Sequence, residues 1–257
     1  MKGYISIIFI LFFVNLFAQE EKDIIKQNSF QLDFGINQIK ERNLHPKVHG
    51  GISYGLTYEH TKRSKNTSNF GVGLVLSRLK TEYEDLSASV NIKLSGNYSY
   101  IFKVVNKNKL VYSVGPEAVL YYNFGFYPNW DESHFYWADY LELGIANNLT
   151  YKINKNRSVE ISLSLPLVSV FSRPELNRQY KIDNISFNGI LDNLHSNLEG
   201  GTIDKSFIAF SRMEYQFHIS DRVIQAICYS YNYQRLKSKE GFSFQDNQHN
   251  IGFKLYF

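Results

Sequence analysis

Hydrophobic and polar residues alternate along most of the chain, and the alternation is clearest at its end. Ile251, Phe253, Leu255 and Phe257 share one parity, and the residues between them are polar or small. A period of two is typical of a β-strand with one apolar face. The last residues therefore predict a strand that ends on an aromatic side chain of its apolar face.

The same period recurs in nine earlier segments, which gives ten predicted strands. Two of these strands contain a proline, Pro116 and Pro166, which cannot donate to a ladder, so we expect a bulge or local break at each. In the seventh segment we expect Phe171 on the same apolar face as Val159. The alternation is clearest over residues 30–37, 51–59, 70–77, 86–102, 110–124, 141–153, 159–171, 212–219, 223–234 and 250–257.

The connections between these strands alternate between short and long. Tight polar turns are expected at 106–108, 154–157 and 220–222, and longer connections at 126–135, 172–205 and 236–247. Ten strands fit this pattern, whereas eight would discard a strand pair and twelve would need a hairpin hidden inside 172–205. Loops of that length are uncommon unless functional or disordered. We expect a hairpin above the barrel there, and a cap or ligand-binding lid is the alternative.

The amino terminus carries the only long apolar run. Lys2 precedes an apolar segment from Ile5 to Phe17, and Ala18 offers a small residue for cleavage. The run is shorter than the ~18 residues that argue for a spanning helix, and it is typical of a secretory signal peptide. We expect residues 1–18 to be removed and 19–257 to form one domain. The single cysteine, Cys228, excludes an internal disulfide and a lipidated new terminus.

Mean hydropathy is −0.30, a value that would suit a soluble protein. It does not exclude a membrane, because in a barrel only alternate residues contact lipid. In lipid every backbone polar group must be paired internally, so an exported membrane protein of this composition is expected to be a closed barrel. The net charge of +4 comes largely from turns and loops, and we expect no nucleic-acid partner.

The terminal strand, with Ile251, Phe253, Leu255 and a final Phe257, resembles the last strand of bacterial outer-membrane β-barrels. The resemblance implies an all-β, transmembrane, antiparallel up-and-down barrel of about ten strands, with short periplasmic turns and longer extracellular loops. It implies that this strand closes the ring and is read by the barrel-assembly machinery. The implied location is the outer membrane of a Gram-negative bacterium, with outer-membrane lipid as the other partner. It transfers no catalytic or ligand residue.

Charged residues on the inward parity form a candidate polar network. The interior of a small barrel is just wide enough for side chains to fill, and buried charges must be paired. We therefore expect a largely filled lumen, with a narrow cation-favouring channel as the alternative; Glu117 joins the network only if Pro116 leaves its parity inward. Arg212 and Lys254 are expected to contact Glu214 and at least one other lumen carboxylate. The candidates are Asp33, Glu59, Lys93, Glu142, Glu160, Arg212, Glu214 and Lys254.

Aromatic residues cluster between residues 121 and 140. We expect an interfacial girdle, where rings with a polar tip lie at headgroup depth; a carbohydrate- or peptide-binding platform is the alternative. The cluster comprises Tyr121, Tyr122, Phe124, Phe126, Tyr127, Trp130, Phe135, Tyr136, Trp137 and Tyr140.

Motifs of catalysis are missing: the chain has no HExxH, P-loop, GxSxG or CxxC. Histidines and aspartates near the outer loops invite comparison with ten-stranded outer-membrane proteases, but no local motif of that family is found. These residues are His45, His49, His134, His195 and His249, with Asp131, Asp183, Asp192 and Asp246.

We expect a non-enzymatic barrel whose loops bind or shield, with no cofactor and no metal. A small-solute pore is the alternative, followed by a rim enzyme, either a protease or a lipid-modifying barrel. The extracellular ligand cannot be read from the sequence.

Overall fold

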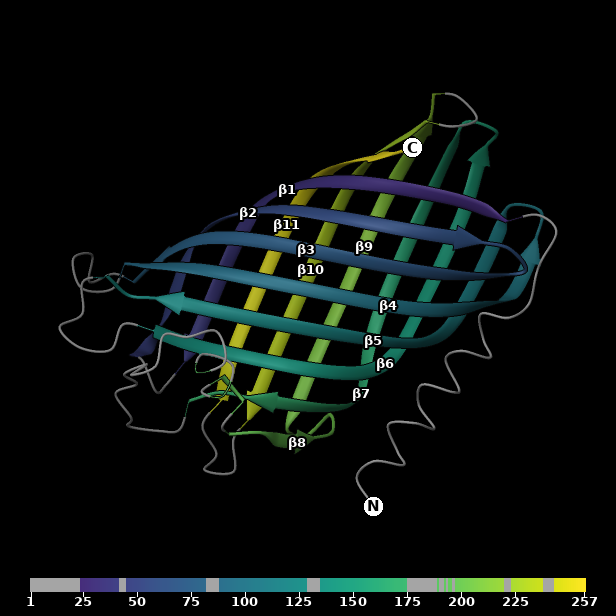
Figure 1. The fold of residues 1–257 in the computed structure, drawn as a ribbon. Helices are drawn as coiled ribbons and strands as arrows, with labels where there is room; N and C mark the ends of the chain where they lie inside the picture. The colour runs from purple at the N-terminus through teal and green to yellow at the C-terminus, as the bar shows by residue number, and fades with distance from the viewer. Residues whose placement is uncertain are drawn as a thin grey trace, which may run out of the picture.

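The computed structural model describes residues 24–41, 45–81, 88–128, 135–174, 189, 192, 194, 195, 197–219, 223–237 and 243–257. In this part of the chain, long tilted strands follow one another around a closed ring (Figure 1). The strands are β1 (Ile25–Glu41), β2 (His45–Arg63), β3 (Asn66–Lys80), β4 (Ser89–Lys107), β5 (Leu110–Phe126), β6 (Phe135–Asn154), β7 (Arg157–Ser172), β8 (Glu199–Gly201), β9 (Ser206–His218), β10 (Ile224–Lys237) and β11 (Ser243–Tyr256).

Sequential antiparallel pairing makes the fold an up-and-down barrel. The order is β6-β5-β4-β3-β2-β1-β11-β10-β9-β7, and pairing of β6 with β7 completes the circle. Ten strands form the ring, which confirms the prediction. The short β8 pairs with the end of β7 and lies at the rim (Figure 1). Of the connection 172–205, where we expect a hairpin, residues 175–188, 190, 191, 193 and 196 lie outside the described residues, as does the expected signal peptide at 1–18.

The outer surface of the ring is apolar, as the alternation predicts. On β1, Phe30, Leu32 and Phe34 are exposed by 48%, 64% and 55%, whereas Gln31 and Asn37 between and beyond them are buried. Every strand of the ring carries at least one exposed large apolar side chain. A soluble sandwich would bury these faces against each other, so their outward direction excludes that alternative. A contiguous apolar surface of this extent is typical of contact with a membrane.

The two ends of the barrel differ. At one end lie the first residue of β1, the last of β11 and the short turns; we call it the turn end. Turns at Ser64–Lys65, Asn108–Lys109 and Lys155–Asn156 connect strands there. The other end carries the longer connections, including the one from β7 to β9, and we call it the loop end.

The terminal strand closes the ring. β11 pairs with β1 from Ser29↔Tyr256 to Glu41↔Phe244 without a register shift. Beyond it, the backbone amides and carbonyls of Asn28 and Phe257 exchange two hydrogen bonds of 2.9 Å. The Phe257 ring stacks on Phe30 of the neighbouring strand at 5.8 Å between centroids.

Pro116 interrupts a ladder without changing its register. The pairs between Ser99↔Glu117 and Phe102↔Val114 are missing, but the same register resumes after the gap. This is the expected local break, because proline has no N–H to donate. Glu117 therefore keeps its inward parity.

A bulge beside Pro166 reverses the face of the end of β7. Leu143 of β6 is opposite Val168 and Gly144 is opposite Pro166, so Leu167 is the extra residue. Leu167 and Val168 are both exposed, whereas Phe171 is fully buried. The expected outward placement of Phe171 is wrong, because one inserted residue moves every later side chain to the opposite face.

Among the described residues, no helix has the length and apolar composition needed to cross a membrane.

Candidate functional site: the barrel interior

The interior of the barrel is hollow over much of its length. A cavity of about 900 Å³ extends from the turn end, where Lys109 and Arg157 line it, to the level of Tyr121 and Tyr140. Beyond that level, towards the loop end, buried apolar side chains occupy the interior. The filling expected from the sequence is therefore complete at the loop end and partial in the rest of the lumen, where charged side chains line the cavity.

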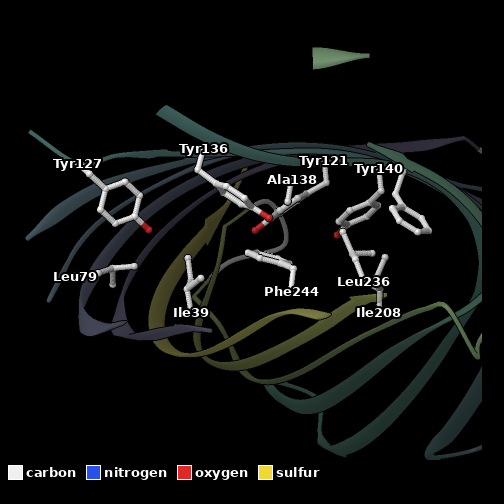
Figure 2. Close-up of a cluster of buried hydrophobic side chains, with 11 residues drawn as sticks. Ile39, Leu79, Tyr121, Tyr127, Tyr136, Ala138, Tyr140, Ile208, Leu236 and Phe244 are labelled. Atoms are coloured by element: carbon white, nitrogen blue, oxygen red, sulfur yellow. The ribbon is translucent and has the colours of Figure 1, made fainter. Parts of the chain in front are cut away.

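Eleven buried side chains, which we call the apolar plug, close the interior near the loop end. Figure 2 shows Tyr121, Tyr136 and Tyr140 facing Phe244 and Leu236 across the lumen. The rings of Tyr121 and Tyr140 stack with centroids 4.9 Å apart, and those of Tyr136 and Phe244 stack at 6.1 Å. The plug consists of Ile39, Leu79, Tyr121, Tyr127, Tyr136, Ala138, Tyr140, Phe171, Ile208, Leu236 and Phe244.

The expected aromatic girdle is wrong for the four tyrosines of the plug. Tyr121, Tyr127, Tyr136 and Tyr140 are at most 5% exposed and point into the barrel. The parity of the strand could have predicted this inward direction, because Tyr121 alternates with outward Leu120 and shares its face with buried Asn123. Of the described members of the cluster, Phe126 is exposed, and Tyr122 and Phe124 are partly exposed on the outward parity. Trp137 also has the outward parity but is fully buried.

An ion pair that the sequence did not single out lies beside the plug. Arg173, just after β7, places Nη2 3.0 Å from Glu41 Oε1 and donates from Nη1 to the carbonyl of Leu236 at 3.0 Å. The hydroxyl of Tyr136 donates to the second oxygen of Glu41. Because these groups come from β1, β6, β10 and the end of β7, they join opposite parts of the rim.

The candidate lumen residues Arg212, Lys254, Glu59 and Glu214 come together in one network. Arg212 Nη1 lies 2.5 Å from Glu59 Oε1, and its Nε lies 2.8 Å from Glu214 Oε1. Lys254 Nζ contacts the same two carboxylates at 2.5 and 3.0 Å. Each cation is thus shared by two anions, and Tyr256 adds a hydrogen bond from its hydroxyl to Glu214.

Lys93 belongs to a separate group nearer the plug. Its Nζ lies 2.6 Å from Asp246 Oδ2 and donates to Gln248 Oε1 at 3.0 Å. Asn123 donates to the same carboxylate at 3.4 Å. Asp246, which the sequence grouped with loop carboxylates, is an inward residue of β11.

The other candidate carboxylates line the cavity without an ion pair among the described residues. Asp33 accepts a hydrogen bond from Gln31 at 2.7 Å, and Glu160 accepts one from Asn148 at 2.7 Å. Glu117 accepts one from the Ser164 hydroxyl. Glu142 is 2% exposed, and its Oε2 has no hydrogen-bond partner among the residues that the structure describes. Four carboxyl groups of the cavity wall therefore lie outside the ion pairs of the described residues.

The histidine and aspartate candidates are not gathered at one place. His195 Nε2 lies 3.3 Å from Asp139 Oδ2 and 3.2 Å from the Tyr122 hydroxyl, beside outward positions of β5 and β6. His49 is buried beside Tyr127, whereas His249 is on the outer surface with Tyr229. His134, Asp131 and Asp183, and the side chain of His45, lie outside the described part of the chain. Within the described part, no group of three or more His, Cys, Asp or Glu side chains could hold a metal ion.

Comparison with known proteins identifies the fold. No family model matches the chain, and no curated protein matches its sequence. The outer membrane protease OmpT from Escherichia coli is similar in structure, with a TM-score of 0.54 and 6% identity over 93% of this chain and 99% of that one. Neisserial surface protein A, from Neisseria, gives a TM-score of 0.38 with 9% identity over 90% of this chain and 97% of that one. Ail from Yersinia pestis gives 0.32 with 12% identity over 90% and 98%. At these identities the likeness to OmpT describes the fold alone: the chain has the closed antiparallel barrel of that solved outer-membrane protein.

Proposed function

We propose that the chain is an outer-membrane β-barrel of a Gram-negative bacterium, exported by the signal peptide at residues 1–18. The turn end faces the periplasm and the loop end faces outwards, since short turns are periplasmic and longer loops extracellular in such barrels. The apolar outer surface of the ten strands supports this placement, because a lipid bilayer is the solvent that such a surface requires.

The function that the geometry supports best is that of a non-enzymatic surface barrel closed to conduction, whose outer loops bind or shield. The apolar plug carries this proposal. Its side chains meet across the lumen near the extracellular end, so an ion would have to leave water to pass them. Arg173 and Glu41 tie the same level of the wall together and oppose opening of the plug.

A gated pore is the second candidate, and the cavity favours it. About 900 Å³ of space with many polar side chains on its wall reaches the plug from the periplasmic end. Movement of Tyr136 and Phe244 away from each other would join this space to the outside. The two candidates differ only in whether the plug opens.

Conductance across a planar bilayer tests the proposal. The purified barrel should insert and remain electrically silent at low and at high KCl concentration and at both signs of voltage. Heat-modifiable migration on a gel verifies, before reconstitution, that the purified protein is folded. Steady current steps that rise with salt concentration would reject the closed barrel in favour of the pore.

Absence of enzymatic activity is part of the proposal, and it has its own test. The inward placement of His49 and the outward placement of His195 and His249 support it, because a hydrolytic centre needs its groups within hydrogen-bond reach of one substrate atom. Peptide cleavage by the folded barrel that disappears in both His195→Ala and Asp139→Asn would contradict it.

A further inference from the structure

The cavity ends, at its deepest point, on a wall that combines carboxylates with aromatic rings. Glu142 of β6 and Glu117 of β5 both line the cavity, and so do Tyr121 and Tyr140. In the β5–β6 ladder, Tyr121 is opposite Tyr140, and Glu117 is opposite Gly144. Glu142 lies between those two levels on the same inward face, so it is a diagonal neighbour of Glu117 and two residues from Tyr140.

Glu142 is part of this wall, and within the described part of the chain its Oε2 has no hydrogen-bond partner. The residue is 2% exposed. Its cross-strand neighbours are Val119 and Ser169, neither of which is positively charged. A Cβ at Gly144, the next inward position, would lie 3.1 Å from Glu142 Oε1, which shows that the carboxylate leans over the glycine on the cavity side.

The described cations deep inside the barrel are paired with other carboxylates. Arg212 and Lys254 are shared by Glu59 and Glu214, and Lys93 is paired with Asp246. An ionised carboxylate buried without a cation is strongly unfavourable, so the carboxyl group either holds a proton or pairs with a cation from outside the protein.

The rings decide which kind of cation fits. The Tyr121 and Tyr140 rings stack at 4.9 Å and form an apolar, electron-rich surface beside the carboxylates. Such faces attract organic ammonium groups through the ring quadrupole and through contact with their alkyl groups. A small hydrated metal ion would gain little from this surface.

Lysines and arginines at the turn end do not oppose binding at this depth. Lys152 is on β6 about ten residues from Glu142, which corresponds to about 33 Å of strand at ~3.3 Å per residue. The Debye length is about 8 Å at physiological ionic strength. The charges at the mouth therefore act on the rate of entry and have little effect on the affinity at the inner wall.

We propose that the inner wall of the cavity, formed by Glu142, Glu117, Tyr121 and Tyr140, binds an organic ammonium compound that enters from the periplasmic end. This assignment rests on the proposed function, in which the cavity opens to the periplasm and is closed by the apolar plug. It adds the class of ligand that the cavity binds.

Calorimetric titration with tetramethylammonium chloride tests the assignment, since this cation is water-soluble and does not enter detergent micelles. The folded barrel in a non-ionic detergent should bind it, whereas sodium at equal ionic strength and neutral tert-butanol should give no saturable heat. The double variant Glu142→Gln/Glu117→Gln should lose at least tenfold in affinity. Glu160→Gln is the matched control, because Glu160 lines the same cavity but is satisfied by Asn148 and Gln216.

Folding is verified by heat-modifiable migration, and the double variant is expected to fold because it removes uncompensated charge. Saturable binding that survives the double substitution, or no binding at all, would overturn the proposal. Equal competition by sodium would overturn the organic character of the ligand. The conductance test is independent: current with intact binding rejects only the closed barrel, and silence without binding rejects only the ammonium site.

Discussion

Lys254 Nζ lies 2.5 Å from Glu59 Oε2, although 195 residues separate the two along the chain. β1 is between their strands in the ring, so the pair crosses a whole strand on the inner wall. Both side chains are nearly inaccessible to solvent. The contact joins the last strand to the second one and reinforces the seam at which the barrel closes.

Replacing Lys254 by Met should destabilise the barrel by about 3–5 kcal/mol, because Glu59 and Glu214 would then share only Arg212 and one buried negative charge would lose its cation. The free energy of unfolding is measured by urea titration in lipid vesicles. Lys237→Met is the control, since Lys237 is exposed at the end of β10 and should change stability by less than about 0.5 kcal/mol. Equal losses in the two variants would contradict a structural role for the network.

Opening the plug should create conductance. Tyr136→Ala/Phe244→Ala removes two stacked rings that face each other across the lumen, and it should produce steady current steps where the native barrel is silent. Stability should fall by several kcal/mol, as for large-to-small changes in a core, so folding is verified first by gel migration. Tyr229→Ala, on the outer face, should stay silent. Silence of the double variant would locate the barrier elsewhere.

Removal of Phe257 should impair assembly. Phe257 exchanges two backbone hydrogen bonds with Asn28 and stacks on Phe30, so its loss weakens the closure of the ring. We expect several-fold less heat-modifiable protein in the outer-membrane fraction of cells. Phe253→Leu keeps an apolar residue on the same face and should assemble normally. Native amounts after deletion of Phe257 would refute an assembly role for this residue.

The bulge at Leu167 predicts an exchange of faces that labelling can detect. In a Cys228→Ser background, Val170→Cys should react with a lipid-soluble maleimide several-fold faster than Phe171→Cys, because Val170 is exposed and Phe171 is buried. Deleting Leu167 should keep this order, since Pro166 and Val168 then become adjacent opposite Gly144 and Leu143 and both later positions keep their partners on β6. A reversed order after the deletion would contradict the assignment of Leu167 as the extra residue.

Alternation of apolar and polar residues was sufficient to predict the strands and most of their faces. Alternation around Phe30, Leu32 and Phe34 was sufficient to place them outwards, because a strand turns successive side chains to opposite faces whatever its neighbours are. The tight turns and the parity of the strands also gave the number of strands in the ring. The face of each residue in a strand depends on local backbone geometry, so the sequence of that segment is sufficient to predict it.

Contacts between side chains of different strands could not be predicted in this way, because they depend on how the strands pair and close the ring. Phe171 turned inwards because β7 gained a residue against β6, and that choice depends on the partner strand. The tyrosines at 121, 136 and 140 became a plug because strands from the opposite wall supply Phe244 and Leu236 at the same depth. Glu142 remained without a cation, whereas Glu59 received two, because ring closure brought Arg212 and Lys254 to one side of the lumen. Parity specifies a face, but depth and curvature of the closed wall specify the contacts on that face.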